Sequence, residues 1–234
     1  MSHISFSELK NWNDCPYKHK LVYIDKIKQF VGNEYTAFGK AIHSACEEFL
    51  LKEDQKEISL FFEKQFLKEL SELQKSNVEL KNELVSQMRI QGIALAKLAL
   101  PALRRQFTKF EVCSIEEQLM EPIENFENYK FKGFIDLAIK TPDGKYHIID
   151  WKTCSWGWDT KRKTDKMTTY QLTLYKNYFA SKHNIDPGAI KTYFALLKRT
   201  AKKNQVEIFE VASGAKKTKN ALKLMESAIY NITN

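Results

Sequence analysis

The 234-residue sequence has no long apolar run and no segment typical of a secretion signal. A membrane-spanning helix needs roughly 20 predominantly apolar residues, and no stretch of this chain approaches that length. The first residues also lack the basic start and the apolar stretch of a signal peptide. We therefore expect a protein that does not enter a membrane and that works in the cytoplasm.

Cysteine is scarce, because the chain has only Cys15, Cys46, Cys113 and Cys154, and no two of them form a C-x-x-C pair. Cysteines scattered so widely do not make the disulfide framework of a small secreted protein, and in a reducing compartment they stay thiols. The sequence also contains no repeat. With 43% hydrophobic residues, the chain is long enough for one domain with a sizeable core.

Acidic residues are outnumbered, since 37 Lys and Arg face 29 Asp and Glu and leave a formal charge of +8. An excess of positive charge favours polyanionic partners when it is clustered. The clusters that we predict to contact nucleic acid are Lys161, Arg162, Lys163 and Lys166, and further along Lys198 and Arg199. Such clusters neutralise phosphates without sequence preference.

Two tryptophans, Trp156 and Trp158, lie just before the first basic cluster. Aromatic side chains stack on splayed bases whatever the sequence, so both are candidates for contacting single-stranded nucleic acid. The alternative is that they are lid or core residues, and the sequence does not decide between the two.

Two carboxylates and a lysine form the most informative pattern. Residues 129–138 are typical of a strand, Thr141-Pro142-Asp143-Gly144 of a hairpin turn, and residues 145–153 of the returning strand. Asp150 and Lys152 project to the same side of that strand, and the pairing brings Asp136 close to Asp150. Two close carboxylates repel unless a cation lies between them, and oxygen ligands suit Mg²⁺ or Mn²⁺. The alternative is an ordinary pair of charged surface residues.

Further segments occur in a fixed order around this hairpin. They are Ser5-Phe-Ser7 with Cys15-Pro16, then Gly39-Lys-Ala-Ile-His43, and after the hairpin Gln171-Leu-Thr-Leu-Tyr175. Together with Asp136 and the Asp150-x-Lys152 strand, they resemble the RecB-like branch of the PD-(D/E)xK nucleases. The resemblance covers most of the chain. It departs from the superfamily name at Ile135, which stands in place of the proline.

The resemblance implies a metal-ligand set. His43, Asp136 and Asp150 would hold one or two Mg²⁺ or Mn²⁺ ions, helped by the backbone carbonyl of Trp151 and by a glutamate on the strand ahead of the hairpin. For that glutamate we favour Glu117 over Glu116. Outside this context, a lone histidine beside Ala41 and Ile42 is more often a packed residue than a ligand.

The catalytic residues implied by the resemblance are Asp136, Asp150, Lys152, Gln171 and Tyr175. Lys152 would orient the attacking water and stabilise charge on the phosphate. Gln171 and Tyr175 are four residues apart on a predicted helix and so face the same way, towards the site. The alternative is that this helix simply packs an apolar stripe on the sheet.

Some relatives of this branch hold an iron–sulfur cluster with one early cysteine and three late ones. Here all four cysteines precede Gln171, and a cluster would need four suitably placed thiolates. We therefore predict no cluster.

The expected fold is α/β, a restriction-endonuclease-like core with a mixed central sheet flanked by helices in a single domain, residues 1–234. Residues 53–110 exceed what that core needs and predict a helical insertion or arch. The expected helices are 5–14, 37–52, 56–75, 78–108 with a break at Pro101, 166–183 and one from 214. The expected strands are 111–121, 129–140, 145–153, 190–198 and 205–211.

The predicted function is metal-dependent cleavage of DNA, as an exonuclease on single-stranded or frayed ends in replication, recombination or repair. The short chain is similar to stand-alone phage nucleases, so we expect a bacterial or phage origin. The alternatives are a catalytically silent DNA-binding subunit of the same fold, a structure-specific endonuclease, or a metal-dependent hydrolase of small phosphorylated molecules.

Overall fold

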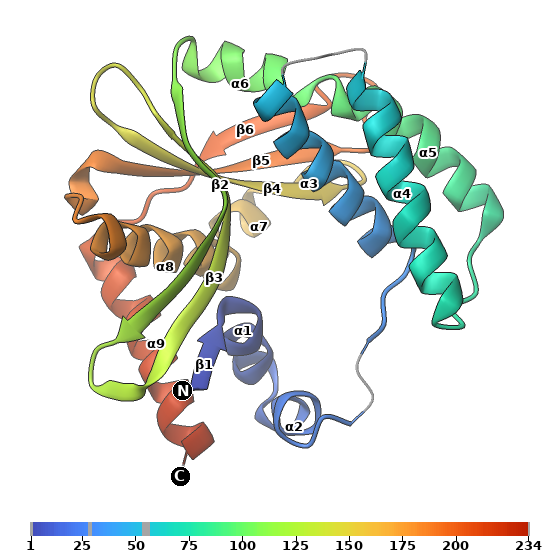
Figure 1. The fold of residues 1–234 in the computed structure, drawn as a ribbon. Coiled ribbons are helices and arrows are strands. Elements are labelled where there is room, and N and C mark those ends of the chain that lie inside the picture. Colours follow the sequence, from blue (N-terminus) through green and yellow to red (C-terminus); the bar gives the residue numbers. More distant parts are fainter. Residues whose placement is uncertain (1, 28–29, 53–56, 234) are drawn as a thin grey trace.

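A computed structural model gives the fold and describes residues 2–27, 30–52 and 57–233. A mixed sheet of six strands lies between two layers of helices (Figure 1). The strands are β1 (Ser2–Ser5), β2 (Glu111–Ile123), β3 (Phe126–Lys140), β4 (Tyr146–Cys154), β5 (Ile190–Lys198) and β6 (Val206–Glu210). The predicted α/β fold with a mixed, helix-flanked sheet is confirmed.

Strand β3 is the centre of the sheet and has an interrupted edge. β2 pairs antiparallel along one edge of β3. The other edge is shared, because β1 pairs in parallel with residues 129–132 and β4 pairs antiparallel with residues 137–140. Residues 133–136 therefore have no partner strand on that edge among the described residues, and the gap ends at Asp136.

The remaining strands continue the sheet from β4. β5 pairs in parallel with β4, and β6 pairs antiparallel with β5. The β3–β4 connection is the predicted hairpin turn, in which Gly144 has a φ of +80° and its N–H donates to the Thr141 carbonyl at 2.9 Å. Glycine suits this position because the left-handed backbone region is costly for a side chain with a Cβ.

The helices are α1 (Phe6–Asp14), α2 (Pro16–His19), α3 (Glu34–Lys52), α4 (Glu57–Lys75), α5 (Asn82–Ala96), α6 (Ala99–Phe107), α7 (Thr160–Thr164), α8 (Lys166–His183) and α9 (Ala215–Thr233). A π-helical turn, η1 (Lys20–Ile24), follows α2, and a 3₁₀ turn, η2 (Pro187–Ala189), precedes β5. None of the described helices is long and apolar enough to cross a membrane.

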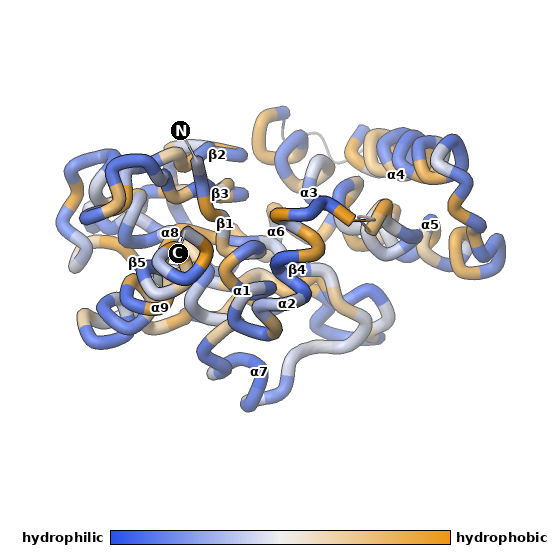
Figure 2. Tube along the Cα trace, turned by 90° about the horizontal axis from the view of Figure 1, so that it is seen from below, coloured by the Kyte–Doolittle hydropathy of each residue, from blue (hydrophilic) through white to orange (hydrophobic). Residues whose placement is uncertain are grey.

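The layer of α3–α6 covers one face of the sheet. Phe38 of α3 packs edge-on against Phe62 and Phe66 of α4, and the same buried cluster reaches Leu137 and Trp151 on the sheet. Each buried phenylalanine contributes roughly 1.5–3 kcal/mol through the area removed from water. In Figures 1 and 2, α4 and α5 extend away from α8 and α9, and hydrophobic and hydrophilic residues alternate along α4.

The layer of α1, α8 and α9 covers the opposite face. Here Phe131 of β3 stacks on Tyr178 of α8 with ring centroids 4.4 Å apart, and Met225 and Ile229 of α9 are buried in the same cluster. Asp165 caps α8 by accepting the Thr168 N–H at 2.7 Å, which fixes the predicted start of this helix. The sheet thus separates two apolar cores.

One predicted helix is divided in the structure. In place of the predicted helix 78–108, α5 begins only at Asn82 and α6 ends at Phe107, and the break falls at Lys97 and Leu98, not at Pro101. Pro101 lies in the first turn of α6, where an amide N–H has no partner inside the helix and a proline costs little. The start of the predicted 53–110 insertion, residues 53–56, lies outside the described residues, and its role as an arch stays a prediction.

Candidate metal centre

Asp136 occupies the point where β3 and β4 separate. The β3–β4 ladder ends at the pair Leu137–Ile149. The next amide of β4 that turns towards β3, the Trp151 N–H, donates to Oδ2 of Asp136 at 2.7 Å instead of to a backbone carbonyl. Asp136 is only 8% exposed, so the gap in the sheet edge is filled by a buried carboxylate.

Asp150 and Lys152 lie beside it on β4, on the same face of the strand. Asp150 is 2% exposed, and its Oδ2 is 2.5 Å from Nζ of Lys152. Burial by itself lowers the pKa of Lys152, but the charges of Asp150 and Asp136 outweigh it, and the net shift is upward. The lysine is therefore a charged ammonium at neutral pH.

His43 reaches the same point from the other side, on α3. Its Nδ1 is 3.5 Å from Oδ2 of Asp136. Burial, and then the charge of Lys152, lower the pKa of His43 to about 4, although a hydrogen bond with the Trp151 backbone opposes this. The imidazole is therefore neutral at pH 7, so its contact with Asp136 is not an ion pair there. Neutral imidazole is the form that coordinates metal ions.

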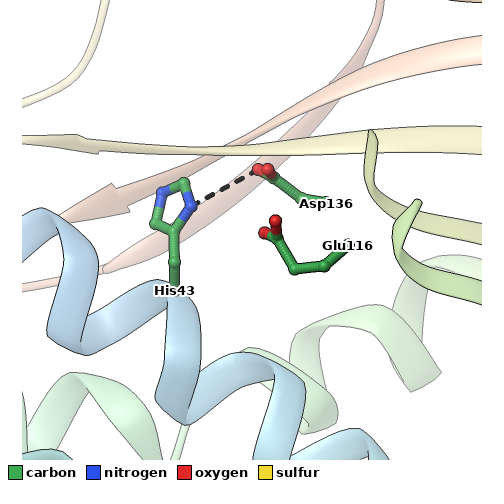
Figure 3. A group of neighbouring side chains, drawn as sticks. All are labelled: His43, Glu116 and Asp136. Atoms are coloured by element: carbon green, nitrogen blue, oxygen red, sulfur yellow. Dashed lines mark ion pairs between the residues drawn. The ribbon is translucent and has the colours of Figure 1, made fainter. Parts of the chain in front are cut away.

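Glu116 completes a group of three. One ligand atom each from His43, Glu116 and Asp136 lie within 4.8 Å of one another, and Figure 3 shows the three side chains converging from α3, β2 and β3. In the β2–β3 register Ile115 faces Leu137 and Glu117 faces Ile135, so Glu116 is opposite Asp136. Glu116 has a φ of +49°, a strained conformation of the kind that clusters at functional sites.

The structure does not place Glu117, the glutamate favoured by the sequence, at this group. Glu117 is held by the other helical layer, where Nζ of Lys182 is 2.8 Å and Nε2 of His183 is 2.6 Å from its Oε1. Successive residues of a strand point to opposite faces, so Glu116 and Glu117 cannot both reach Asp136. The glutamate beside the site is Glu116.

Glu47 was missed by the sequence analysis. It lies one helical turn after His43 on α3, at the i+4 spacing that puts two side chains on one face. Burial, and then the charge of Glu116 and a hydrogen bond with it, raise the pKa of Glu47 to about 7. The spacing His43-x-x-x-Glu47 is visible in the sequence. It indicates that Glu47 lies beside the site only once α3 is known to face the site.

The donor set fits a divalent cation. Burial, followed by the charge of Asp150, raises the pKa of Asp136 well above its usual range, and burial also raises that of Asp150. Buried carboxylates this close carry a high electrostatic cost that a cation removes. Carboxylate oxygens together with one imidazole suit several divalent ions, so the donor types leave the identity of the ion open.

Gln171 and Tyr175 lie on α8, against the gap in β3. Nε2 of Gln171 donates to the Tyr175 hydroxyl at 3.1 Å. A Cβ at Gly133 would come within 2.7 Å of the Tyr175 ring, so only glycine leaves room for this contact. Burial, and then the charge of Asp150, raise the pKa of Tyr175 to about 12. Tyr175 is thus a protonated hydroxyl on the same side as Asp150 and Lys152.

The sequence matches the profile of the PD-(D/E)XK nuclease superfamily over residues 3–233. The chain belongs to this superfamily. The match spans the separated strands β3 and β4 together with the helices that approach them from both layers. Membership implies a nucleic-acid substrate and a divalent metal cofactor for this nuclease.

A comparison with curated protein sequences finds no match for the nuclease. Among solved structures, a protein described as "Crystal structure of SSO0001" is similar with 16% sequence identity and a TM-score of 0.44. That match covers 98% of this chain and 76% of the other.

Of the residues predicted to contact nucleic acid, some are exposed and others are buried. Lys161, Arg162 and Lys166 are exposed around α7, and Trp156 is 71% exposed. Trp158 is 8% exposed and packs on Phe194 in the core, with the Arg162 guanidinium over its outer side at 4.4 Å. For Trp158, then, the core alternative holds, and it cannot stack on a base.

Lys163, Lys198 and Arg199 also differ from the prediction. Lys163 and Lys198 both pair with Glu207 on β6, and Lys198 and Arg199 are each 8% exposed. Their positive charges are therefore engaged inside the protein. Arg199 bonds to Oε1 of Gln91 at 2.6 Å and Oγ of Ser155 at 3.3 Å, which ties the segment after β4 to α5.

Proposed function

We propose that this protein is a divalent-metal-dependent deoxyribonuclease of the RecB-like type, acting as an exonuclease on single-stranded or frayed DNA ends. The observation that carries the proposal is the convergence of His43, Asp136, Asp150 and Lys152 where β3 and β4 separate. Each of these buried or half-buried groups is costly without a ligand, and a scaffold with no catalytic role has no need of all four.

Mg²⁺ or Mn²⁺ would be held by His43, Asp136 and Asp150, with Glu116 and the backbone carbonyl of Trp151 as further oxygen ligands. When bound, such an ion lowers the pKa of water and polarises the phosphate. Around it, the Lys152 ammonium donates hydrogen bonds to the attacked phosphate and offsets its developing charge. Asp150, 2.5 Å away, keeps that ammonium aimed at the site.

Two residues of α8 complete the arrangement on the opposite side. The Tyr175 hydroxyl keeps its proton at neutral pH because its pKa is raised to about 12. It therefore acts as a hydrogen-bond donor towards the phosphate or the leaving oxygen, and not as a base. Gln171 fixes the hydroxyl by donating to it at 3.1 Å.

The preference for single strands is supported by Trp156. This side chain is 71% exposed, four residues after Lys152, on a segment that is itself held in place. The Arg199 and Thr200 N–H groups donate to the carbonyls of Cys154 and Ser155 at 2.8 and 2.9 Å. An exposed indole on a segment whose backbone is held in place is suited to stacking on a base that has left its duplex. Such a substrate occurs during replication, recombination and repair.

The test uses linear single-stranded DNA labelled at either end, together with a covalently closed single-stranded circle, in Mg²⁺, Mn²⁺ or EDTA. The wild type should degrade the linear strand with a metal ion present and spare the circle. Asp150→Asn should abolish degradation, while Asp143→Asn, an isosteric change at the exposed tip of the same hairpin, should leave it intact.

Each of the other outcomes would indicate a different activity. Cutting of the circle would indicate a structure-specific endonuclease, and binding without any cutting by the wild type would indicate a silent DNA-binding subunit. Hydrolysis of nucleotides but not of DNA would indicate a hydrolase of small phosphorylated molecules. Normal degradation by Asp150→Asn would refute the assignment of the site.

A further inference from the structure

Positive charge is distributed unevenly between the two helical layers. In the α3–α6 layer, several basic side chains pair with acids, as in Lys40–Glu69, Lys52–Glu48 and Arg89–Glu63. On α9, the exposed residues Lys216, Lys219 and Lys223 have no ion-pair partner within the described part of the chain. No acidic residue occurs in the sequence between Glu210 and Glu226. Helix α9 thus has four lysines and a single acidic residue, Glu226.

The surface around these lysines is hollowed. Three adjoining depressions of about 760, 840 and 560 Å³ lie along α9, and each shares lining residues with its neighbours. Lys223 lines the first two, and Gly214 lines the first and the third. We call this surface, formed by α7, α8 and the first half of α9, the α9 groove. Its basic residues are Lys161, Lys166, Lys176, Lys216, Lys217, Lys219 and Lys223.

Two of these lysines, Lys176 and Lys217, hydrogen-bond to backbone carbonyls and not to a carboxylate. Nζ of Lys176 donates to the Ser213 carbonyl at 3.4 Å, and Nζ of Lys217 donates to the Ala212 carbonyl at 3.0 Å. Both bonds hold the segment that enters α9, and burial lowers the pKa of both lysines. The two carboxylates that line the groove are Asp165 and Glu226. Asp165 is engaged as the cap of α8.

The groove and the metal centre lie on opposite sides of α8. Gln171 and Tyr175 face the gap in β3, whereas Lys166, Tyr170 and Lys176 line the groove. Lys166 and Tyr175 are nine residues apart, about half a turn around the helix axis at 3.6 residues per turn. Lys161 and Lys166 on α7 and α8 connect the two sides along the chain that leaves β4.

We propose that the α9 groove binds the sugar–phosphate backbone of the nucleic-acid substrate, and so holds the strand at a second place while its end is in the metal centre. The proposal rests on the proposed function, because it assigns the substrate class of the same nuclease. Unpaired lysines along an open groove attract phosphates without reading bases, which suits an enzyme that must accept any sequence.

A protein partner fits the groove less well. Protein interfaces depend on exposed aromatic or large apolar residues that act as anchors. The large apolar residues that are exposed among the described residues, such as Phe30, Ile90 and Trp156, do not line the groove. Tyr170 does line it but is only 7% exposed. Apolar residues such as Met167, Leu222 and Leu224 also line the groove but are half-buried, whereas Lys216, Lys219 and Lys223 are exposed.

The test compares two triple variants of the full chain. One removes the α9 lysines, as Lys216→Gln, Lys219→Gln and Lys223→Gln, and the other removes the same charge from the α3–α6 layer, as Lys64→Gln, Lys68→Gln and Lys97→Gln. Binding of a labelled 30-nucleotide single strand is measured in EDTA over a range of salt concentrations. The slope of log Kd against log salt should fall by about 2 in the α9 variant, since each phosphate contact contributes roughly 0.7 for a single strand. An equal slope in the two variants would overturn the proposal.

Cleavage supplies a second readout. With Mn²⁺, the α9 variant should raise KM for the 30-mer about tenfold and leave kcat unchanged, because the lost contacts are exposed ion pairs far from the chemistry. KM for a dinucleotide should not change, since its single internucleotide phosphate occupies the metal centre and leaves none to reach the groove on the other side of α8. An equal rise in KM for both lengths would contradict a second binding place.

The same experiments separate this proposal from the proposed function. If the wild type binds the 30-mer but cleaves nothing, the proposed function fails while the slope comparison still decides the groove. Finally, binding of polyglutamate is measured in the same way as binding of the DNA. If it binds the wild type as tightly as DNA and loses the same slope in the α9 variant, the groove is a site for acidic protein segments and the proposal is wrong.

Discussion

The two helical layers do different work on the same sheet. The α3–α6 layer brings an imidazole and a carboxylate, His43 and Glu47, towards Asp136, and several of its surface charges are paired. The α1, α8 and α9 layer brings neutral hydrogen-bonding groups, Gln171 and Tyr175, and an unpaired basic surface. The candidate metal centre lies between them, where β3 has a gap in one edge and the sheet is open to both layers. A break in strand pairing thus creates the place where the two sets of side chains meet.

The largest effect is expected where the layers meet, at Lys152. Lys152→Met keeps the length of the side chain but removes the donor aimed at the phosphate, so kcat should fall roughly 10²–10³-fold, the cost of losing one preorganised donor. Lys191→Met, on the neighbouring strand β5 and paired with Glu210, removes a charge from outside the site. Steady-state cleavage of a labelled single strand measures both. Comparable rates for the two variants would remove Lys152 from the chemistry.

The packing of the α3–α6 layer can be broken without touching the site. A Cβ at Gly92 of α5 would come within 1.9 Å of the Phe62 ring, so Gly92→Ala should lower the free energy of unfolding by about 1–3 kcal/mol through overpacking. Gly214→Ala, at the start of the other layer, meets nothing within 4 Å and should change it by less than about 0.5 kcal/mol. Urea unfolding measures both, and a stable Gly92→Ala protein would contradict this packing of α4 on α5.

The smallest effect concerns pH and Glu47. In the unfolded chain a glutamate titrates near its ordinary pKa of 4.5, whereas in the folded protein the pKa is raised to about 7. The folded state therefore holds its proton longer, and stability is lost as pH rises from about 4.5 through 7. Glu47→Gln cannot titrate, so it should raise Tm relative to the wild type at pH 8 and not at pH 5.

Thermal melts in EDTA across this pH range measure the effect, because no bound ion then offsets the charge of Glu47. Glu48→Gln is the matched control, since Glu48 is the next residue of α3 and pairs with Lys52 on the surface. A Tm difference for Glu47→Gln that does not change with pH would show that burial and the neighbouring Glu116 do not raise the pKa of Glu47 in the folded protein.

Several features follow from the sequence because they are local. The hairpin at Thr141–Gly144 depends on proline and glycine at favoured turn positions, and α8 and β5 have the predicted bounds because a capping aspartate and an apolar run define them. The D-x-K strand places Asp150 and Lys152 on one face by alternation alone. Together with the order of the motifs, these were enough to predict the fold class and the family.

Only the tertiary structure decided which neighbouring residue reaches the site. Continued regularly from the pair Ile123–Phe126, the β2–β3 hairpin would put Cys113 opposite Asp136 and Glu117 on its face. An irregularity between Pro122 and Ile123 shifts the register by an odd number of residues, so Glu116 faces Asp136 instead. Likewise, the sequence gives Trp158 and Lys198 no sign of burial. They are covered because β6 packs against both: Phe209 lies against Trp158, and Glu207 pairs with Lys198. No local pattern around Trp158 or Lys198 encodes these contacts.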